Sequence, residues 1–376
     1  MNILFFITIL FFSLGQLGRI SMFHQLVNFY LYEIPLLITF LYLIWFFKLK
    51  PIKQGLKNFK VIFGFVGVML FSYLLNFSKF SSFQNFVSFL YLVRLLLYLG
   101  FWGYLAYYLK KKPRFAQTVF NGLIIFSLLT AISSFIQYFL YPDLRNLFYL
   151  GWDPHLYRMF GVFFDTSVAA AIYGLLFLFF IKSYKNYKSH KYYKILGTIF
   201  IPTFLLTVIL TFSRSVYFAL PIVVIYYFIS QKKFSLVFAF LTVFLLLIFF
   251  VPKPFGEGVN LKRVFSIESR VNDYKHAINI WKRAPFFGIG YNRIRFVKQN
   301  SVDSHAASSF SSSYLIILVT GGILGLFGFI ASLGKLWLIN KKSRIFLLFL
   351  GLLSFTDNII LHPFIMFFLG LVMVDK

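Results

Sequence analysis

The sequence predicts an all-α fold: a polytopic membrane bundle of about twelve transmembrane helices, forming a single integral membrane domain over residues 1–376. Of the 376 residues, 60% are hydrophobic and 56 are Phe, and the mean hydropathy is +0.82. The apolar runs are continuous and many approach the roughly 20 residues that cross a bilayer, whereas a barrel would show short alternating segments. Most of the +27 net charge lies in short loops between these runs, so we predict no nucleic-acid partner.

The predicted spans follow from the apolar runs. These fall near residues 3–18, 31–47, 61–76, 86–108, 116–140, 166–181, 195–211, 215–230, 234–251, 312–334, 345–357 and 361–374. The first run lacks a basic leader and a small-residue cleavage site, so we expect a membrane helix and not a cleaved signal. Between the last two, "TDN" and "HP" predict a turn; the alternative is one long tilted span and eleven crossings.

Basic and acidic residues are segregated along the chain. The basic connections are residues 48–60, 110–114, 182–194, 231–233 and 340–344, and none contains Asp or Glu. An even number of apolar runs separates each from the next, so all can lie on the cytoplasmic side. Every acid except Asp375 then falls on the opposite side or at its border. We therefore expect a multi-pass protein of the cell membrane, with both termini cytoplasmic and any active site extracytoplasmic.

A large extracytoplasmic loop, residues 252–311, is predicted between the ninth and tenth spans. In it, "SIESRVNDYKHAINIWKRAP" has an apolar stripe of Val271, Tyr274, Ile278 and Trp281, which predicts an amphipathic helix at the membrane surface or over the bundle. The "GIGYNR" that follows lacks the glycines and lysine of a nucleotide loop and is typical of a helix stop and turn. Without cysteine and with scattered histidines, the sequence predicts no metal site and no cofactor.

Two arginines lie where a membrane makes charge costly. Arg214 separates two apolar runs, and Arg94 lies about eight residues inside its span. Each either extends to the headgroups, has a partner, or binds an anion such as a lipid phosphate. The large loop adds Arg270, Arg293 and Arg295, and several converging guanidinium groups suit a pyrophosphate, although each alone is also compatible with a solvated charge.

Other titratable groups are candidates for proton transfer. His305 can act as a base near neutral pH, and Asp303, two residues away, can orient it. A surface histidine is the simpler alternative. Asp165 and Asp357 lie at outer helix ends and are possible accessory residues.

Four stretches, in order, resemble the O-antigen ligase and polymerase superfamily. They are "RMFGVFFDTSVAA" (158–170), "LTFSRSVYFAL" (210–220), "SRVNDYKHAINIWKRAPFFGIGYNRIR" (269–295) and "SSYLIILVTGGILGLFGFI" (312–330). The resemblance, with the twelve-span layout, covers essentially the whole chain. Two positions depart from the family pattern: Thr166 and Ser167 replace "PN" in the first motif, and Ser311 occupies the position of a histidine before the closing helix.

The resemblance implies a membrane glycosyltransferase without a metal, which moves a glycan from an undecaprenyl-pyrophosphate donor to a lipid, glycan or protein acceptor and inverts the anomeric centre. It implies that Arg214 and Arg270 contact the pyrophosphate, with Arg295, Arg293 and Arg94 as further ligands and Arg158 as an accessory residue. The catalytic histidine of the family would align with Ser311, and His305, six residues upstream, is the nearest histidine that could replace it.

Three alternatives stay open. A polymerase of the same superfamily differs from a ligase only in its acceptor. A non-enzymatic flippase for lipid-linked glycans also needs many spans, but should show cations deep in both halves of the bundle, and Arg94 is the only clearly buried charge expected. A peptidoglycan polymerase of the shape, elongation and division type would need an acidic catalytic residue such as Asp357 or Asp165.

Overall fold

The protein, seen in a computed structural model, is described over all residues except 151, 187–190, 255–256, 262–264, 299–308 and 374–376. The α-helices in this part are α1 (Asn2–Phe12), α2 (Glu33–Phe47), α3 (Lys50–Asn58), α4 (Lys60–Leu75), α5 (Ser82–Lys111), α6 (Phe115–Leu140), α7 (Thr166–Asn186), α8 (Lys191–Leu210), α9 (Arg214–Ser230), α10 (Phe234–Phe250), α11 (Phe265–Arg283), α12 (Ile294–Lys298), α13 (Ser313–Ile339), α14 (Arg344–Thr356) and α15 (Pro363–Met373). Strands β1 (Arg19–Met22) and β2 (Val27–Tyr30) pair antiparallel. This hairpin was not predicted from the sequence, because its four-residue strands lie between two apolar runs.

The helices support a membrane protein without confirming twelve crossings. Among the described residues, four helices (α5, α6, most of α7, and α13) are long and apolar enough to span, and a fifth span results if α2 and α3, bent by 87°, are taken together. Shorter apolar helices of 10–17 residues include α1, α4, α9, α10 and α15. The predicted break near the C-terminus is present, because α14 ends at Thr356 and α15 begins at Pro363.

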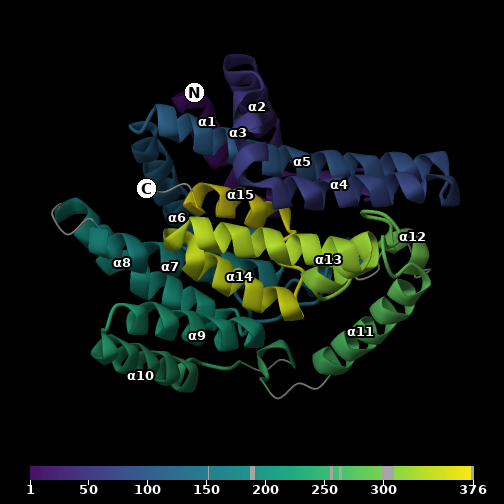
Figure 1. Cartoon of the computed structure of the whole chain (residues 1–376). Helices are drawn as coiled ribbons and strands as arrows, with labels where there is room; N and C mark the ends of the chain where they lie inside the picture. The colour runs from purple at the N-terminus through teal and green to yellow at the C-terminus, as the bar shows by residue number, and fades with distance from the viewer. Residues whose placement is uncertain (151, 187–190, 255–256, 262–264, 299–308, 374–376) are drawn as a thin grey trace.

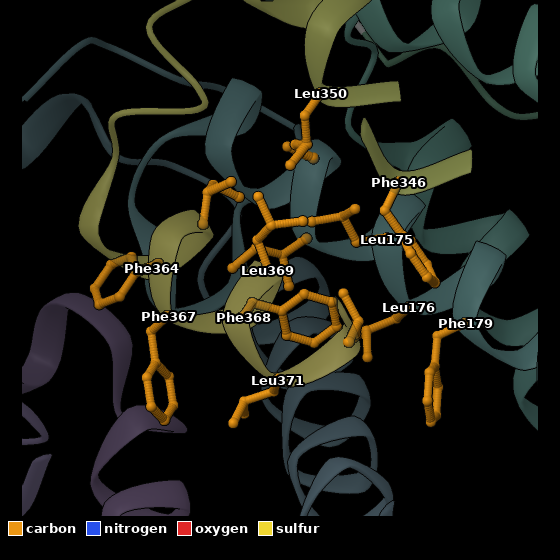
Figure 2. Packing of buried hydrophobic residues seen from close by; sticks show 14 of the residues in the cluster. Leu175, Leu176, Phe179, Phe346, Leu350, Phe364, Phe367, Phe368, Leu369 and Leu371 are labelled. Atoms are coloured by element: carbon orange, nitrogen blue, oxygen red, sulfur yellow. The ribbon is translucent and has the colours of Figure 1, made fainter. Parts of the chain in front are cut away.

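The last three helices form the centre of the molecule (Figure 1), where α13 packs on α4, α14 on α9, and α15 on both α5 and α7. Helix α15 is apolar on all sides and almost wholly buried, as expected of a central helix. Figure 2 shows Phe368 of α15 beside Leu176 of α7, while Phe364 and Phe367 point to the other side of α15, where they pack on Phe12 of α1. This core fixes the ends of α7 and α14, and candidate residues lie at those ends.

The "PFFGIG" turn packs into a break in α13. Gly322 interrupts that helix with a φ of 66°. The amides of Ile289 and Gly290 donate to the carbonyls of Val319 and Thr320, at 3.0 Å each, and the amide of Ile323 donates to the carbonyl of Pro285 at 2.8 Å. A side chain at Gly288 would meet the Val319 carbonyl oxygen at 2.4 Å. The glycines therefore do form a turn, and the turn also satisfies backbone groups that the break leaves unpaired.

Helix α11 confirms a helix at the position predicted within residues 252–311, and it packs on α13 through a face other than the predicted apolar stripe. Ala277 and Ile280 are buried against α13, whereas Val271 and Ile278 are 45% and 39% exposed. The predicted stripe therefore faces away from the bundle on at least two of its four positions. Small Ala277 permits close packing on α13, which a stripe based on large residues alone does not detect.

Candidate active site

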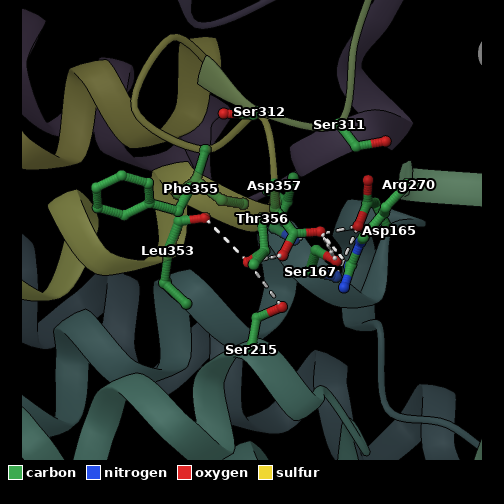
Figure 3. Close-up of polar contacts among 12 residues, drawn as sticks. Asp165, Ser167, Ser215, Arg270, Ser311, Ser312, Leu353, Phe355, Thr356 and Asp357 are labelled. Atoms are coloured by element: carbon green, nitrogen blue, oxygen red, sulfur yellow. Dashed lines mark hydrogen bonds and ion pairs between the residues drawn. The ribbon is translucent and has the colours of Figure 1, made fainter. Parts of the chain in front are cut away.

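A charged cluster lies at the C-terminal end of α14, where Asp357 ends the helix (Figure 3). Arg270 of α11 donates from Nη2 to Oδ1 of Asp357 at 2.8 Å, and the side chains are 28% and 12% exposed. Tyr274, one turn further along α11, donates its hydroxyl to the carbonyl of Phe355. The large loop is thereby attached to α14 at two points, and Arg270 is held with part of its guanidinium accessible.

Three helices begin at this cluster. Ser167, near the start of α7, donates its hydroxyl to Oδ1 of Asp357 at 3.1 Å. Ser215, near the start of α9, accepts from the Thr356 hydroxyl at 3.0 Å, and Ser313, the first residue of α13, donates to the Asp357 carbonyl at 3.4 Å. Helix N-termini carry partial positive charge. At α7 and α13 the first amides already donate to Asp165 and Ser312. The convergence of the helix N-termini favours an anion beside Arg270.

Arg214, the first residue of α9, is the second cation of this region. It is half-buried, and its Nη1 donates to the carbonyl of Leu261 at 3.3 Å. Burial, and after it the positive charge of Arg270, lower the pKa of the Arg214 guanidinium. Two neighbouring guanidinium groups are stabilised by an anion that bridges them. The structure thus brings together Arg214, Arg270 and Asp357 from the predicted set.

Asp165 joins the cluster through the start of α7. Its Oδ1 accepts from the amides of Ser167 at 2.6 Å and Val168 at 3.1 Å, as an N-terminal cap does. Burial raises the pKa of Asp165 to about 6, and the charges of Asp153 and Asp357 add to this, against the amide hydrogen bonds that lower it. The Asp165 carboxyl therefore exchanges its proton just below neutral pH.

Arg158 has a structural position behind the cluster. Its guanidinium is buried and donates from Nε to the carbonyl of Thr211 at 2.9 Å, at the end of α8. Its own carbonyl accepts from Gln137 of α6. These contacts hold the segment before α7 to the turn that carries Arg214.

Arg94 has a carboxylate partner. It donates from Nε and Nη2 to the two carboxylate oxygens of Glu33, at 2.6 and 2.7 Å. Tyr98 donates to the same carboxylate at 2.5 Å. This bidentate ion pair between α2 and α5 compensates the Arg94 charge within the protein, so the arginine needs no lipid anion there.

Arg293 and Arg295 also lie apart from the Arg270 cluster. Arg293 is completely buried: its Nη2 donates to Asn85 at 2.5 Å and its guanidinium lies 4.7 Å from the Tyr73 ring centroid. Arg295 donates to the carbonyl of Gln25 at 3.2 Å and faces a cavity beside Arg94. The expectation that Arg94 is the only clearly buried charge was therefore wrong, because Arg293 is enclosed by the aromatic residues around α4 and α5.

The chain after "GIGYNR" contacts α11 through Lys298 and Ser311, and not through Arg293 or Arg295. Lys298 of α12 donates to Oδ1 of Asp273 at 2.9 Å, and Ser311 donates to the same carboxylate. His305 and Asp303 lie outside the described residues. Within the described ranges, no group of three or more His, Cys, Asp or Glu could hold a metal ion.

One segment of the chain is similar in sequence to a known protein family. Residues 199–330 match the family model of O-antigen ligase. The match begins in α8 and ends in α13, so it contains Arg214, Arg270 and the turn that enters the α13 break. It confirms the resemblance to the O-antigen ligase family and supports a glycan-transferring function of ligase or polymerase type in a membrane. No curated protein matches the chain.

Several residues of the cluster were not found from the sequence. Ser167, Ser215, Ser313 and Thr356 read as ordinary capping residues or turn formers, and only the packing of α14 against three helix starts gives them a shared position. Glu33 was detectable in principle, because an arginine eight residues inside a span requires a partner and Glu33 is an acid at the border of a neighbouring span.

Proposed function

We propose that the protein is an O-antigen-ligase-like glycosyltransferase that takes a glycan from a polyprenyl-pyrophosphate donor to an acceptor hydroxyl at the extracytoplasmic face. The observation that carries the proposal is the presence of two cations, Arg270 and Arg214, both inside the segment that matches the O-antigen ligase family, at a cluster where three helices begin. Cations and helix N-termini suit a pyrophosphate.

In the proposed mechanism, Arg270 is aimed by Asp357 and, with Arg214, stabilises the negative charge that develops on the departing pyrophosphate. The acceptor oxygen forms a bond to the anomeric carbon as the bond to the pyrophosphate oxygen breaks, which inverts that carbon. A base takes the proton of the acceptor hydroxyl, and we assign this role to His305, oriented by Asp303. No metal takes part in the proposal, and turnover in EDTA tests this.

The test is release of polyprenyl pyrophosphate from a radiolabelled polyprenyl-pyrophosphate glycan by the protein reconstituted in liposomes. Arg270→Ala and Arg214→Ala are each expected to lower release by about 100-fold or more, the size of a lost transition-state contact. Arg145→Ala is the matched control, because Arg145 forms an exposed pair with Asp143. Undiminished release in both cluster variants would contradict the assigned roles.

The same assay separates the alternatives. A flippase moves the intact donor across the liposome membrane without releasing pyrophosphate. A ligase and a polymerase both release it, and they differ in whether a lipid or protein, or a second lipid-linked glycan, gains the sugar. For the base, His305→Ala is expected to abolish turnover; an active variant with a flat rate between pH 5 and 8 would remove His305 from the mechanism.

A further inference from the structure

A second site lies beside the arginine cluster: a cavity of about 210 Å³ under the β-hairpin. Its lining comes from β2, from α5, from the segment before α12 and from the turn between α14 and α15. Asn358 lines it and directly follows Asp357, the partner of Arg270. The cavity is thus one residue along the chain from the proposed pyrophosphate site.

The lining carries two arginines. Arg94 is paired through two hydrogen bonds with the Glu33 carboxylate, whereas Arg295 donates to the uncharged carbonyl of Gln25. Removing Arg94 from that carboxylate would leave a buried charge unpaired, at considerable cost. A pyrophosphate, with its several negative charges, is therefore better accommodated at Arg270 and Arg214.

The remaining lining offers hydrogen-bonding groups, which include His362 and three uncharged side chains. Tyr291, Asn292 and Asn358 line the cavity. The Tyr291 hydroxyl, the Asn292 side-chain amide and Nδ2 of Asn358 make no hydrogen bond to another residue in the described part of the chain. Burial raises the pKa of Tyr291 to about 12, so its hydroxyl stays protonated and can donate. Tyr30, Tyr91 and Tyr98 supply ring surface around these groups.

We infer that this cavity binds one uncharged sugar unit of the glycan substrates. Aromatic surface with a few converging donors and acceptors is typical of small-molecule sites, and a volume below the roughly 300–1,000 Å³ of drug-sized pockets suits a single small ring. A neutral, hydroxyl-rich ring meets the uncharged groups of the lining. The inference rests on the proposed function for its substrates, and the sugar belongs either to the donor glycan or to the acceptor.

Binding can be measured without turnover, by saturation-transfer NMR on the protein in nanodiscs. The probes are free glucose, galactose, rhamnose and N-acetylglucosamine, with glucuronate as the charged counterpart. We expect saturation transfer to at least one neutral sugar. Tyr291→Phe removes only the hydroxyl, and Asn292→Gly keeps the positive φ of 56° at that position; each is expected to weaken binding about three- to tenfold, as for one lost neutral hydrogen bond.

Tyr141→Phe is the matched control, because the Tyr141 hydroxyl bonds to Asn146 on the surface and not in the cavity. Three results would overturn the inference even if donor turnover is intact. They are no saturation transfer to any neutral sugar, a preference for glucuronate, or an unchanged sugar affinity when Tyr291→Phe and Asn292→Gly are combined. If the protein binds the sugar but releases no pyrophosphate from the donor, the inference about the cavity stands and the proposed function is overturned. In the turnover assay, a raised donor KM in Tyr291→Phe assigns the sugar to the donor, and a raised acceptor KM assigns it to the acceptor.

Discussion

Two arginine–carboxylate pairs in this molecule have different surroundings. Arg94 and Glu33 form a bidentate pair with side chains 14% and 9% exposed, and two further donors, Tyr98 and the Tyr30 amide, complete the carboxylate. Arg270 and Asp357 share one hydrogen bond, Arg270 is 28% exposed, and a second cation, Arg214, lies close to it. The first pair is internally compensated, while the second keeps cationic capacity for a ligand.

This difference separates structure from chemistry among arginines that look alike in the sequence. Loss of one member of a compensated, buried pair lowers the stability of the protein strongly, because the other member is left as an unpaired buried charge. A partly accessible guanidinium beside another cation gains from an external anion. The predictions below test this contrast.

The largest effect is expected for Glu33→Gln, which removes the charge that compensates Arg94. We expect a loss of about 3–5 kcal/mol of stability, enough to remove most folded protein. Fluorescence-detected size exclusion after heating measures this. Replacing both residues, by Glu33→Gln with Arg94→Met, should recover folded protein, and Asp143→Asn, in an exposed pair, should change little. If Glu33→Gln is as stable as wild type, Arg94 is not held by this pair.

Asp357→Asn tests the second pair and should affect rate more than stability. The amide keeps the shape of Asp357 but holds Arg270 less firmly, so the guanidinium is aimed less well at the departing group. We expect kcat to fall by about 10- to 100-fold. The donor KM should stay equal or fall, because the site becomes more positive. Steady-state kinetics of pyrophosphate release measure both, and a rise in KM with unchanged kcat would show that Asp357 acts in binding alone.

The sequence predicted the helical membrane class, the amphipathic helix of the large loop and the glycine turn after it, because periodicity and turn chemistry are local. It identified Arg214, Arg270 and Asp357 as candidates, but not that Asp357, 87 positions from Arg270, is its partner. Such pairings depend on how α11 packs on α13 and contacts the end of α14. Local sequence patterns do not predict this packing. For the same reason Arg293 looked like a loop cation, although packing encloses it beside Asn85.

The smallest predicted effect concerns Asp165, the carboxyl that caps the start of α7. Its pKa is raised to about 6 in the folded protein by burial first and by neighbouring carboxylates. A raised carboxyl pKa contributes stability that is fully present below the ordinary pKa near 4 and is lost as pH rises through about 6. Asp165→Asn keeps a capping side chain at α7 and removes this titration.

We therefore expect Asp165→Asn to match wild type in Tm at pH 4.5 and to exceed it by about 2 °C or more at pH 8, measured by thermal unfolding in detergent. Asp143→Asn is the control, since hydrogen bonds from Arg145 lower the pKa of Asp143 and its titration ends well below this window. A Tm difference that is constant from pH 4.5 to 8 would mean that Asp165 does not titrate there. The charge of the cluster would then stay the same from pH 4.5 to 8, and binding of an anionic donor beside Arg270 would not depend on the protonation of Asp165.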